Sequence, residues 1–239
     1  MIVTSLDSTD GGDWVLITQS DHARLAGEIL GLFPALAEHP LRQELLRATR
    51  EHDNGWAEAD SAPRVDGDGR PHDFKTLPGD ERLRLWRRGI ERHRAQDPAV
   101  ALLILRHALN LHRRARGPAW TEALREWREL EAELRELCLL DDELVAETYG
   151  WLDLADSISL VACRGLRASQ ADPFRIEAVG PESPDLFSTV RITPFPLAGA
   201  TTFRVTARRI PRRAYRNDTE LALAAAGARW QRLQVLMKP

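Results

Sequence analysis

His22, the adjacent pair His52-Asp53, and Asp156 are the residues whose types best suit a metal site. Imidazole nitrogens and carboxylate oxygens together bind divalent transition metals such as manganese, iron and zinc. A buried carboxylate costs several kcal/mol unless it is paired or binds a cation. If all four side chains turn into the core, one or two shared divalent ions compensate their charges best.

Helical spacing predicts that three of these side chains point inward, because residues three, four and seven apart share one face of a helix. The apolar residues at those spacings are Leu25, Ala26 and Ile29 for His22, Leu41 and Leu45 for His52, and Val145, Leu152 and Leu160 for Asp156. Asp53 lies about 100° further around its helix than His52 and can reach the same point. The spacing favours Asp156 over Asp153. The alternative for each residue alone is a hydrogen-bonded core histidine or a helix-capping aspartate.

The elements that would position these residues are mostly helices. The expected helices run from 20 or 21 to 33, 40 to 54, 79 onward, 97 or 98 to 117, 120 to 138, and 141 or 142 to Leu166. Residues 57–78 hold three prolines and two glycines, so we expect a loop that forms one wall of the site. Strands are expected at 14–18, 190–193, 203–206 and 230–237, with a short helix capped by Asp218.

This pattern predicts a mainly α protein, with a helical domain over residues 1–169 and a small α+β subdomain over residues 170–239. The charge also divides there, since residues 170–239 carry 11 Lys and Arg against 6 Asp and Glu. Much of that excess lies in the Arg-rich segment 208–216, which is either a solvated face or an edge that faces phosphate. An acidic body without a basic stripe argues against nucleic-acid binding.

The remaining bulk features favour a cytoplasmic protein. The N-terminal residues show no signal peptide, and the apolar run at 99–105 is far shorter than the ~18 residues of a spanning helix. We therefore expect no membrane partner, and a homodimer is an open alternative to a monomer. The only cysteines, Cys138 and Cys163, are expected to be buried thiols.

The order of the proposed ligands resembles a known pattern. A histidine, a His-Asp pair ending a helix, and a distant aspartate are similar to the ligands of the HD phosphohydrolase superfamily. The blocks Gln19-Ser20-Asp21-His22-Ala23, Glu51-His52-Asp53-Asn54-Gly55-Trp56, Pro71-His72-Asp73-Phe74 and Ala155-Asp156-Ser157-Ile158-Ser159-Leu160 resemble the bacterial family named domain of unknown function 3891. The resemblance implies an HD-like helical bundle and metal ligation by His22, His52, Asp53 and Asp156.

A metal-dependent phosphohydrolase acting on a small phosphorylated or nucleotide substrate is the function that this resemblance implies. A bound divalent ion would polarise a phosphoryl oxygen and lower the pKa of water. We expect Asp53 to hold or deprotonate that water. Two roles are open for His107: it is a structural residue of the core, or it contacts a second metal or the substrate.

Residues beside these ligands are assigned supporting roles. Lys75 in the loop would bind substrate phosphate, together with His72 and Asp73. Asp21 and Glu51 flank ligands and would orient their rings. Two alternatives stay open: a di-iron enzyme that uses oxygen, and a non-catalytic regulatory module that binds a metal or ligand.

Overall fold

The computed structural model describes residues 1–5, 12–164 and 168–239. The helices are α1 (Gln19–Leu30), η1 (Pro34–Leu36), α2 (Arg42–Glu51), η2 (Asn54–Trp56), α3 (Ala57–Ser61), α4 (Gly79–Arg94), α5 (Pro98–His112), α6 (Pro118–Leu137), α7 (Asp142–Arg164) and α8 (Asp218–Gly227). The strands are β1 (Ile2–Ser5), β2 (Asp13–Ile17), β3 (Ala168–Ala171), β4 (Phe174–Val179), β5 (Leu186–Thr193), β6 (Thr201–Pro211) and β7 (Trp230–Lys238).

One mixed sheet contains all seven of these strands, in the order β1-β2-β6-β7-β5-β4-β3. The pair β5–β7 is parallel and the other pairs are antiparallel. The fold is therefore α+β, and the prediction of a mainly α, HD-like bundle with a small appendage was wrong. The reason is long-range pairing, because β2 from the N-terminal segment pairs with β6. The division at residues 169 and 170 stays a prediction.

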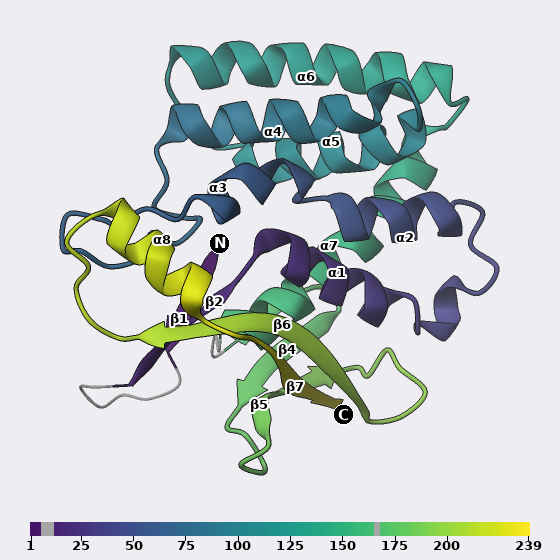
Figure 1. Cartoon of the computed structure of the whole chain (residues 1–239). Helices are drawn as coiled ribbons and strands as arrows, with labels where there is room; N and C mark the ends of the chain where they lie inside the picture. Colours follow the sequence, from purple (N-terminus) through teal and green to yellow (C-terminus); the bar gives the residue numbers. More distant parts are fainter. Residues whose placement is uncertain (6–11, 165–167) are drawn as a thin grey trace.

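Helices α1, α2, α4, α5, α6 and α7 stack on one side of this sheet (Figure 1). Helices α1 and α7 contact the strands, α2 and α5 pack on them, and α4 and α6 form the outer part of the stack. The main apolar core runs from the sheet through these helices, from Val15 and Ile17 on β2 to Trp127 on α6. The site described below lies within this helical stack.

Strand β2 shows how the sheet is covered on both faces. Val15 and Ile17 belong to the main core, whereas Leu16 between them belongs to a second cluster with Ile210 and Leu221. Alternation follows from the two-residue period of a strand. Helix α8 lies on this second face, as Figure 1 shows beside β1 and β6.

Element boundaries differ from the expected ones mainly at caps and in the short strands. Thr18, rather than Ser20 or Asp21, caps α1, since its side chain accepts a hydrogen bond from the Asp21 amide. Asn217, rather than Asp218, caps α8. The supposed loop after residue 56 begins with the short helix α3, and β1, β3 and β4 were not expected. The expected end of the long helix at Leu166 lies outside the described residues.

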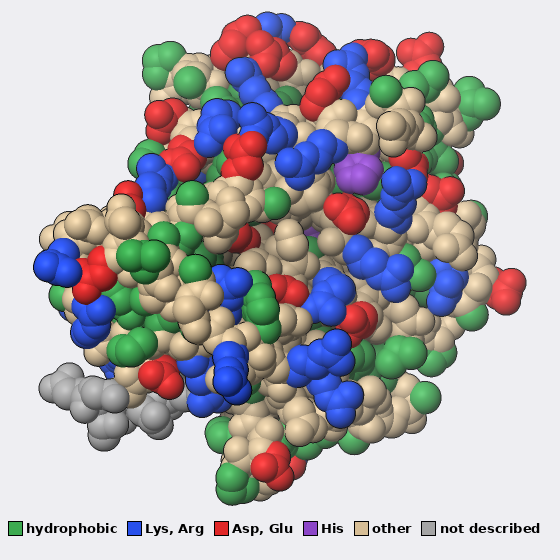
Figure 2. Space-filling view, in the orientation of Figure 1, with side chains coloured by type: hydrophobic (Ala, Val, Ile, Leu, Met, Phe, Trp, Pro, Cys, Tyr) green, Lys and Arg blue, Asp and Glu red, His purple; other side chains and the backbone are tan. Residues whose placement is uncertain are grey.

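The surface shown in Figure 2 mixes basic and acidic side chains, with a histidine visible in a recess near its centre. Within the described residues, we find no helix with the length and apolar character needed to cross a bilayer. Cys163 is buried, Cys138 is partly exposed, and both are free thiols.

Candidate metal centre

Three helices bring His22, His52 and Asp156 together in the core. The side chains belong to α1, the end of α2 and the middle of α7, and each residue is at most 5% exposed. His22 Nε2 lies 2.8 Å from Asp156 Oδ1, and His52 Nε2 lies 3.4 Å from the same oxygen. One ligand atom from each residue falls within 4.8 Å of the others, so the three could hold a metal ion. Their inward direction agrees with the helical spacing.

Asp53 joins this cluster from the side of His52. Its Oδ2 lies 3.4 Å from His52 Nε2 and 3.9 Å from His22 Nε2. The Nε2 amide of Gln19 donates a hydrogen bond of 3.0 Å to the same Oδ2. Gln19 was not expected at the site, although its position one helical turn before His22 could have indicated it.

Hydrogen-bond partners determine which nitrogen of each histidine faces the carboxylates. Ser159 Oγ donates to the Asp156 carbonyl, so it accepts from His22 Nδ1 at 2.8 Å. The Thr49 carbonyl can only accept, so His52 Nδ1 donates to it at 2.8 Å. Both Nε2 atoms are therefore turned toward Asp53 and Asp156. Such fixed tautomers are typical of metal-binding histidines.

His107 has the same arrangement. The Tyr149 hydroxyl donates to Asp153 Oδ1 at 2.9 Å and accepts from Asn110 Nδ2 at 2.8 Å. It therefore faces His107 Nδ1 as an acceptor, at 3.4 Å. His107 Nε2 then lies 3.8 Å from Asp156 Oδ2, and its ring centroid is 4.9 Å from that of His52. Asp153 thus belongs to the support of His107, whereas Asp156 belongs to the cluster.

Electrostatics in the cluster couple the imidazoles to the carboxylates. Burial alone would lower the pKa of His52, but Asp53 and Asp156 outweigh it and hold that pKa well above its usual value. Burial alone would raise the pKa of Asp156, but hydrogen bonds with His22 and His52 hold it well below its usual value. The pKa of Asp53 is lowered in the same way, chiefly by His52. Burial lowers the pKa of His107.

These side chains fit a divalent ion. His52 Nε2 is buried without a hydrogen-bond partner among the described residues. Imidazole lone pairs that face carboxylate oxygens in a buried site repel one another unless a proton or a cation lies between them. Nitrogen and oxygen donors of this kind suit manganese, iron or zinc.

The turn after His52 and Asp53 is held against α4. Asn54 Nδ2 donates to the Gly89 carbonyl at 3.2 Å, and Arg92 donates to the Asn54 carbonyl. A Cβ on Gly55 would overlap the carbonyl oxygen of Leu85, so only glycine fits this close approach. The Asn-Gly pair therefore positions the end of the ligand helix.

A pocket of about 340 Å³ opens onto the cluster. Its lining consists of Gln19, His22, Asp53, Trp56, Phe74, Lys75, Arg82, Trp86, His107, Leu111, His112, Asp156 and Leu160. Of these, Trp56, Arg82, Trp86 and His112 were not predicted as site residues. Arg82 and Trp86 are one turn apart on α4, which is the only sequence signal that links them.

The loop residues predicted to bind substrate have different positions. Lys75 lines the pocket, and burial together with Arg164 lowers its pKa. Asp73 instead accepts two hydrogen bonds from Arg164, at 2.8 and 3.0 Å, and one from the Val3 amide. His72 bonds Thr76 at 2.7 Å and is not part of the pocket lining. The structure thus brings only Lys75 to the pocket.

The acidic residues predicted to orient ligand rings also lie elsewhere. Asp21 accepts hydrogen bonds from Thr18 and Arg24, both at 2.7 Å. The carboxylate of Glu51 is 4.0 Å from His93. Neither faces a ligand histidine, because each side chain leaves its helix toward the surface, and neutral hydroxyl and carbonyl groups orient the rings instead.

Arginines of the Arg-rich segment 208–216 contact aromatic and acidic side chains near the sheet. The Arg208 guanidinium lies 3.9 Å from the centroid of the Trp230 ring, and Arg213 lies 4.3 Å from that of Tyr215. Arg213 and Arg216 also pair with Glu220, at 2.7 and 3.1 Å. None of these arginines lines the pocket at the cluster.

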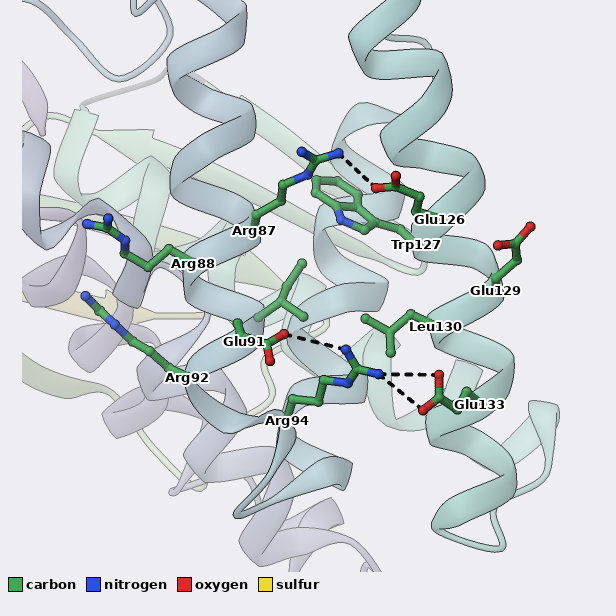
Figure 3. A pocket seen from close by; sticks show the side chains of 11 residues that line it. Arg87, Arg88, Glu91, Arg92, Arg94, Glu126, Trp127, Glu129, Leu130 and Glu133 are labelled. Atoms are coloured by element: carbon green, nitrogen blue, oxygen red, sulfur yellow. Dashed lines mark hydrogen bonds and ion pairs between the residues drawn. The ribbon is translucent and has the colours of Figure 1, made fainter.

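A larger groove of about 810 Å³ lies between α4 and α6 (Figure 3). Arg87 bonds Glu126 at 2.8 Å across it, and Arg94 bonds Glu133 at 3.2 Å. Its charged groups thus neutralise one another, so we do not regard this groove as the functional site.

Comparison with known proteins adds the family. A family model described as "Protein of unknown function (DUF3891)" matches residues 1–212. No curated protein and no solved structure matches the chain. Because the model covers most of the sequence and all the cluster residues, the chain belongs to the DUF3891 family.

Proposed function

We propose that this chain is a metal-dependent phosphohydrolase that acts on a small phosphorylated or nucleotide substrate. The observation that carries the proposal is the common orientation of His22, His52 and His107, whose Nε2 atoms all face Asp53 or Asp156. The order of the ligands along the chain also resembles that of HD phosphohydrolases. We therefore propose that this α+β fold contains an HD-type metal site.

The ligand set would comprise His22, His52, Asp53 and Asp156, with His107 available to a second ion. A divalent ion held there would supply Lewis acidity toward a phosphoryl oxygen and would lower the pKa of water. Imidazole and carboxylate donors admit manganese, iron or zinc.

Asp53 is the residue to which we assign the nucleophilic water. Its lowered pKa keeps the carboxylate ionised, so it can accept a hydrogen bond or a proton. The Gln19 amide donates a hydrogen bond to the Oδ2 atom of this carboxylate, and the Asp53 side chain lines the pocket. Lys75, in the loop that also lines the pocket, provides positive charge for the substrate.

The test is a hydrolysis panel with nucleotides, sugar phosphates and cyclic dinucleotides, in which loss of substrate and formation of products are followed by chromatography. Protein purified without a chelating tag is loaded separately with Mn²⁺, Fe²⁺ and Zn²⁺. We expect turnover with at least one metal, loss of turnover in Asp53→Ala, and no change in Asp185→Asn, an exposed carboxylate outside the site. Metal-loaded protein that hydrolyses no compound of the panel would contradict the proposal and favour a binding module.

The same metal-loaded proteins distinguish the hydrolase from the alternative of a di-iron enzyme that uses oxygen. An iron-loaded protein with a visible absorption band that responds to oxygen would favour the di-iron enzyme. A colourless protein active with manganese supports the hydrolase.

A further inference from the structure

The pocket beside the cluster contains several buried polar atoms that lack a hydrogen-bond partner. Among the described residues these are the donors Trp56 Nε1, Arg82 Nε and Trp86 Nε1, together with His112 Nε2 and the acceptor Gln19 Oε1. Buried polar atoms in proteins are nearly always partnered. Several unpartnered atoms around one pocket therefore indicate the hydrogen-bonding groups that a bound ligand would need to supply.

Most of these atoms can only donate. Indole Nε1 and guanidinium Nε carry hydrogen and have no acceptor capacity, whereas the imidazole of His112 can do either. Trp56 and Trp86 are each 3% exposed, so water outside the pocket cannot readily satisfy them. The matching ligand is rich in acceptors, as an oxyanion is.

The positive charge of Arg82 at this pocket is not paired with a carboxylate of the described residues. On α4, arginines 84, 87, 88 and 94 all pair with glutamates. The guanidinium of Arg82 has no ion pair with a described residue, although it lies on the same helix. A partly buried arginine without a carboxylate partner is well suited to bind an anion in its fork.

Ring contacts join these groups and connect them to the metal centre. The Trp86 ring centroid is 5.9 Å from that of His112 and 5.8 Å from that of His107. The Trp120 ring centroid is 4.3 Å from that of His112, with the two planes 32° apart, so this contact also restricts the His112 ring. Arg82 precedes Trp86 by one helical turn, so its side chain is on the same face of α4.

We propose that Arg82, Trp86 and His112 form a subsite for a second anionic group of the substrate, next to the group that reaches the metal centre. The substrate class, which rests on the proposed function, is then a small phosphorylated molecule with two oxyanions, such as a diphosphate or a phosphorylated carboxylic acid. A volume of about 340 Å³ is near the lower end for ligand pockets (~300–1,000 Å³), which favours a small molecule.

Pyrophosphate is the probe that tests the subsite. Its binding to the full chain is measured by calorimetry, both metal-loaded and after removal of metal with a chelator. We expect Arg82→Gln to weaken binding at least about tenfold in both states, because a charge-assisted fork is lost. Arg82→Lys keeps the charge without the fork, and we expect it to recover only part of the affinity.

Arg84→Gln is the matched control, since Arg84 is exposed on the same helix and pairs with Glu58 at 3.2 Å. It removes the same charge, and we expect its pyrophosphate affinity to stay within about twofold of wild type. Equal weakening by both glutamine variants would reduce the effect to net charge and overturn the subsite. Absence of pyrophosphate binding to the wild type in both states would also overturn it.

Trp86→Phe keeps an aromatic ring and removes only the indole N–H. We expect a smaller loss of pyrophosphate affinity, about threefold to tenfold, with unchanged metal content. Unchanged affinity would remove Trp86 from the subsite. Arg82-dependent binding by a protein that hydrolyses none of the panel would retain the subsite and refute only the hydrolase, so the two failures can be told apart.

Discussion

A substitution of Ser159 tests directly whether its hydroxyl orients the His22 imidazole for metal binding. Its hydroxyl is 0% exposed and accepts the Nδ1 proton of His22 at 2.8 Å. Ser159→Ala leaves that N–H buried without an acceptor, which costs about 1–3 kcal/mol of stability. Loss of such a support typically weakens metal affinity about 10- to 100-fold, or about 1.4–2.7 kcal/mol.

The affinity is measured by competition with a chromophoric chelator for Zn²⁺, and folding by urea denaturation of the metal-free protein. Ser188→Ala is the control, since Ser188 is also buried and its hydroxyl donates to the Ala162 carbonyl at 2.9 Å, away from the cluster. We expect it to lose stability but not metal affinity. Equal zinc affinity in wild type and Ser159→Ala would refute the argument that this hydroxyl orients a ligand.

Two further perturbations test the surroundings of the site. Gly55→Ala forces a Cβ onto the Leu85 carbonyl oxygen, so we expect a loss of about 2–3 kcal/mol in urea unfolding, whereas Gly150→Ala, with open space around its Cβ, should be neutral or stabilising. A Gly55→Ala protein as stable as wild type would show that the turn does not need this close approach. Burial, helped by Arg82, lowers the pKa of His112 from its usual value of about 6.5 to about 4. Between these values the unfolded chain binds more protons, so stability falls as pH falls from 6.5 to 4. His112→Gln should remove about 2 kcal/mol of the difference in unfolding free energy between pH 7.5 and 4.5, and an unchanged pH profile would contradict it.

Local patterns in the sequence were enough to predict most helices and the inward direction of the cluster. Helical spacing is a short-range property, so the apolar residues around His22, His52 and Asp156 define a buried face without knowledge of the partner helices. Adjacency to His52 was enough to propose Asp53, which lies beside the cluster.

The sheet could not be predicted in the same way. β2 and β6 are separated by most of the chain, and no local signal says that Val15 pairs with Arg209. Strands β1 and β3 have only four residues each, too few for a clear alternation, whereas most of the six residues of β4 do alternate and this strand was missed. The expectation of a mainly α protein failed for this reason.

The supporting groups of the site were also beyond local reasoning. Ser159, Thr49 and Tyr149 act through one carbonyl or hydroxyl each, and these groups became recognisable only when the imidazole nitrogens were placed. Acidic neighbours such as Asp21 were the natural candidates from sequence, but their direction depends on the tertiary structure. Arg82 is one of six arginines on α4, and only the tertiary structure shows that it has no ion pair with a described residue.

The metal content of the purified chain tests the central claim most directly. Protein expressed without a chelating tag is measured by elemental analysis, before and after loading with Mn²⁺, Fe²⁺ or Zn²⁺, beside His52→Ala. We expect about one or two transition-metal ions per wild-type chain and a loss of bound metal in the variant, because His52 Nε2 has no hydrogen-bond partner among the residues that the structure describes. A folded wild-type protein that contains no transition metal and cannot be loaded with any would contradict the account.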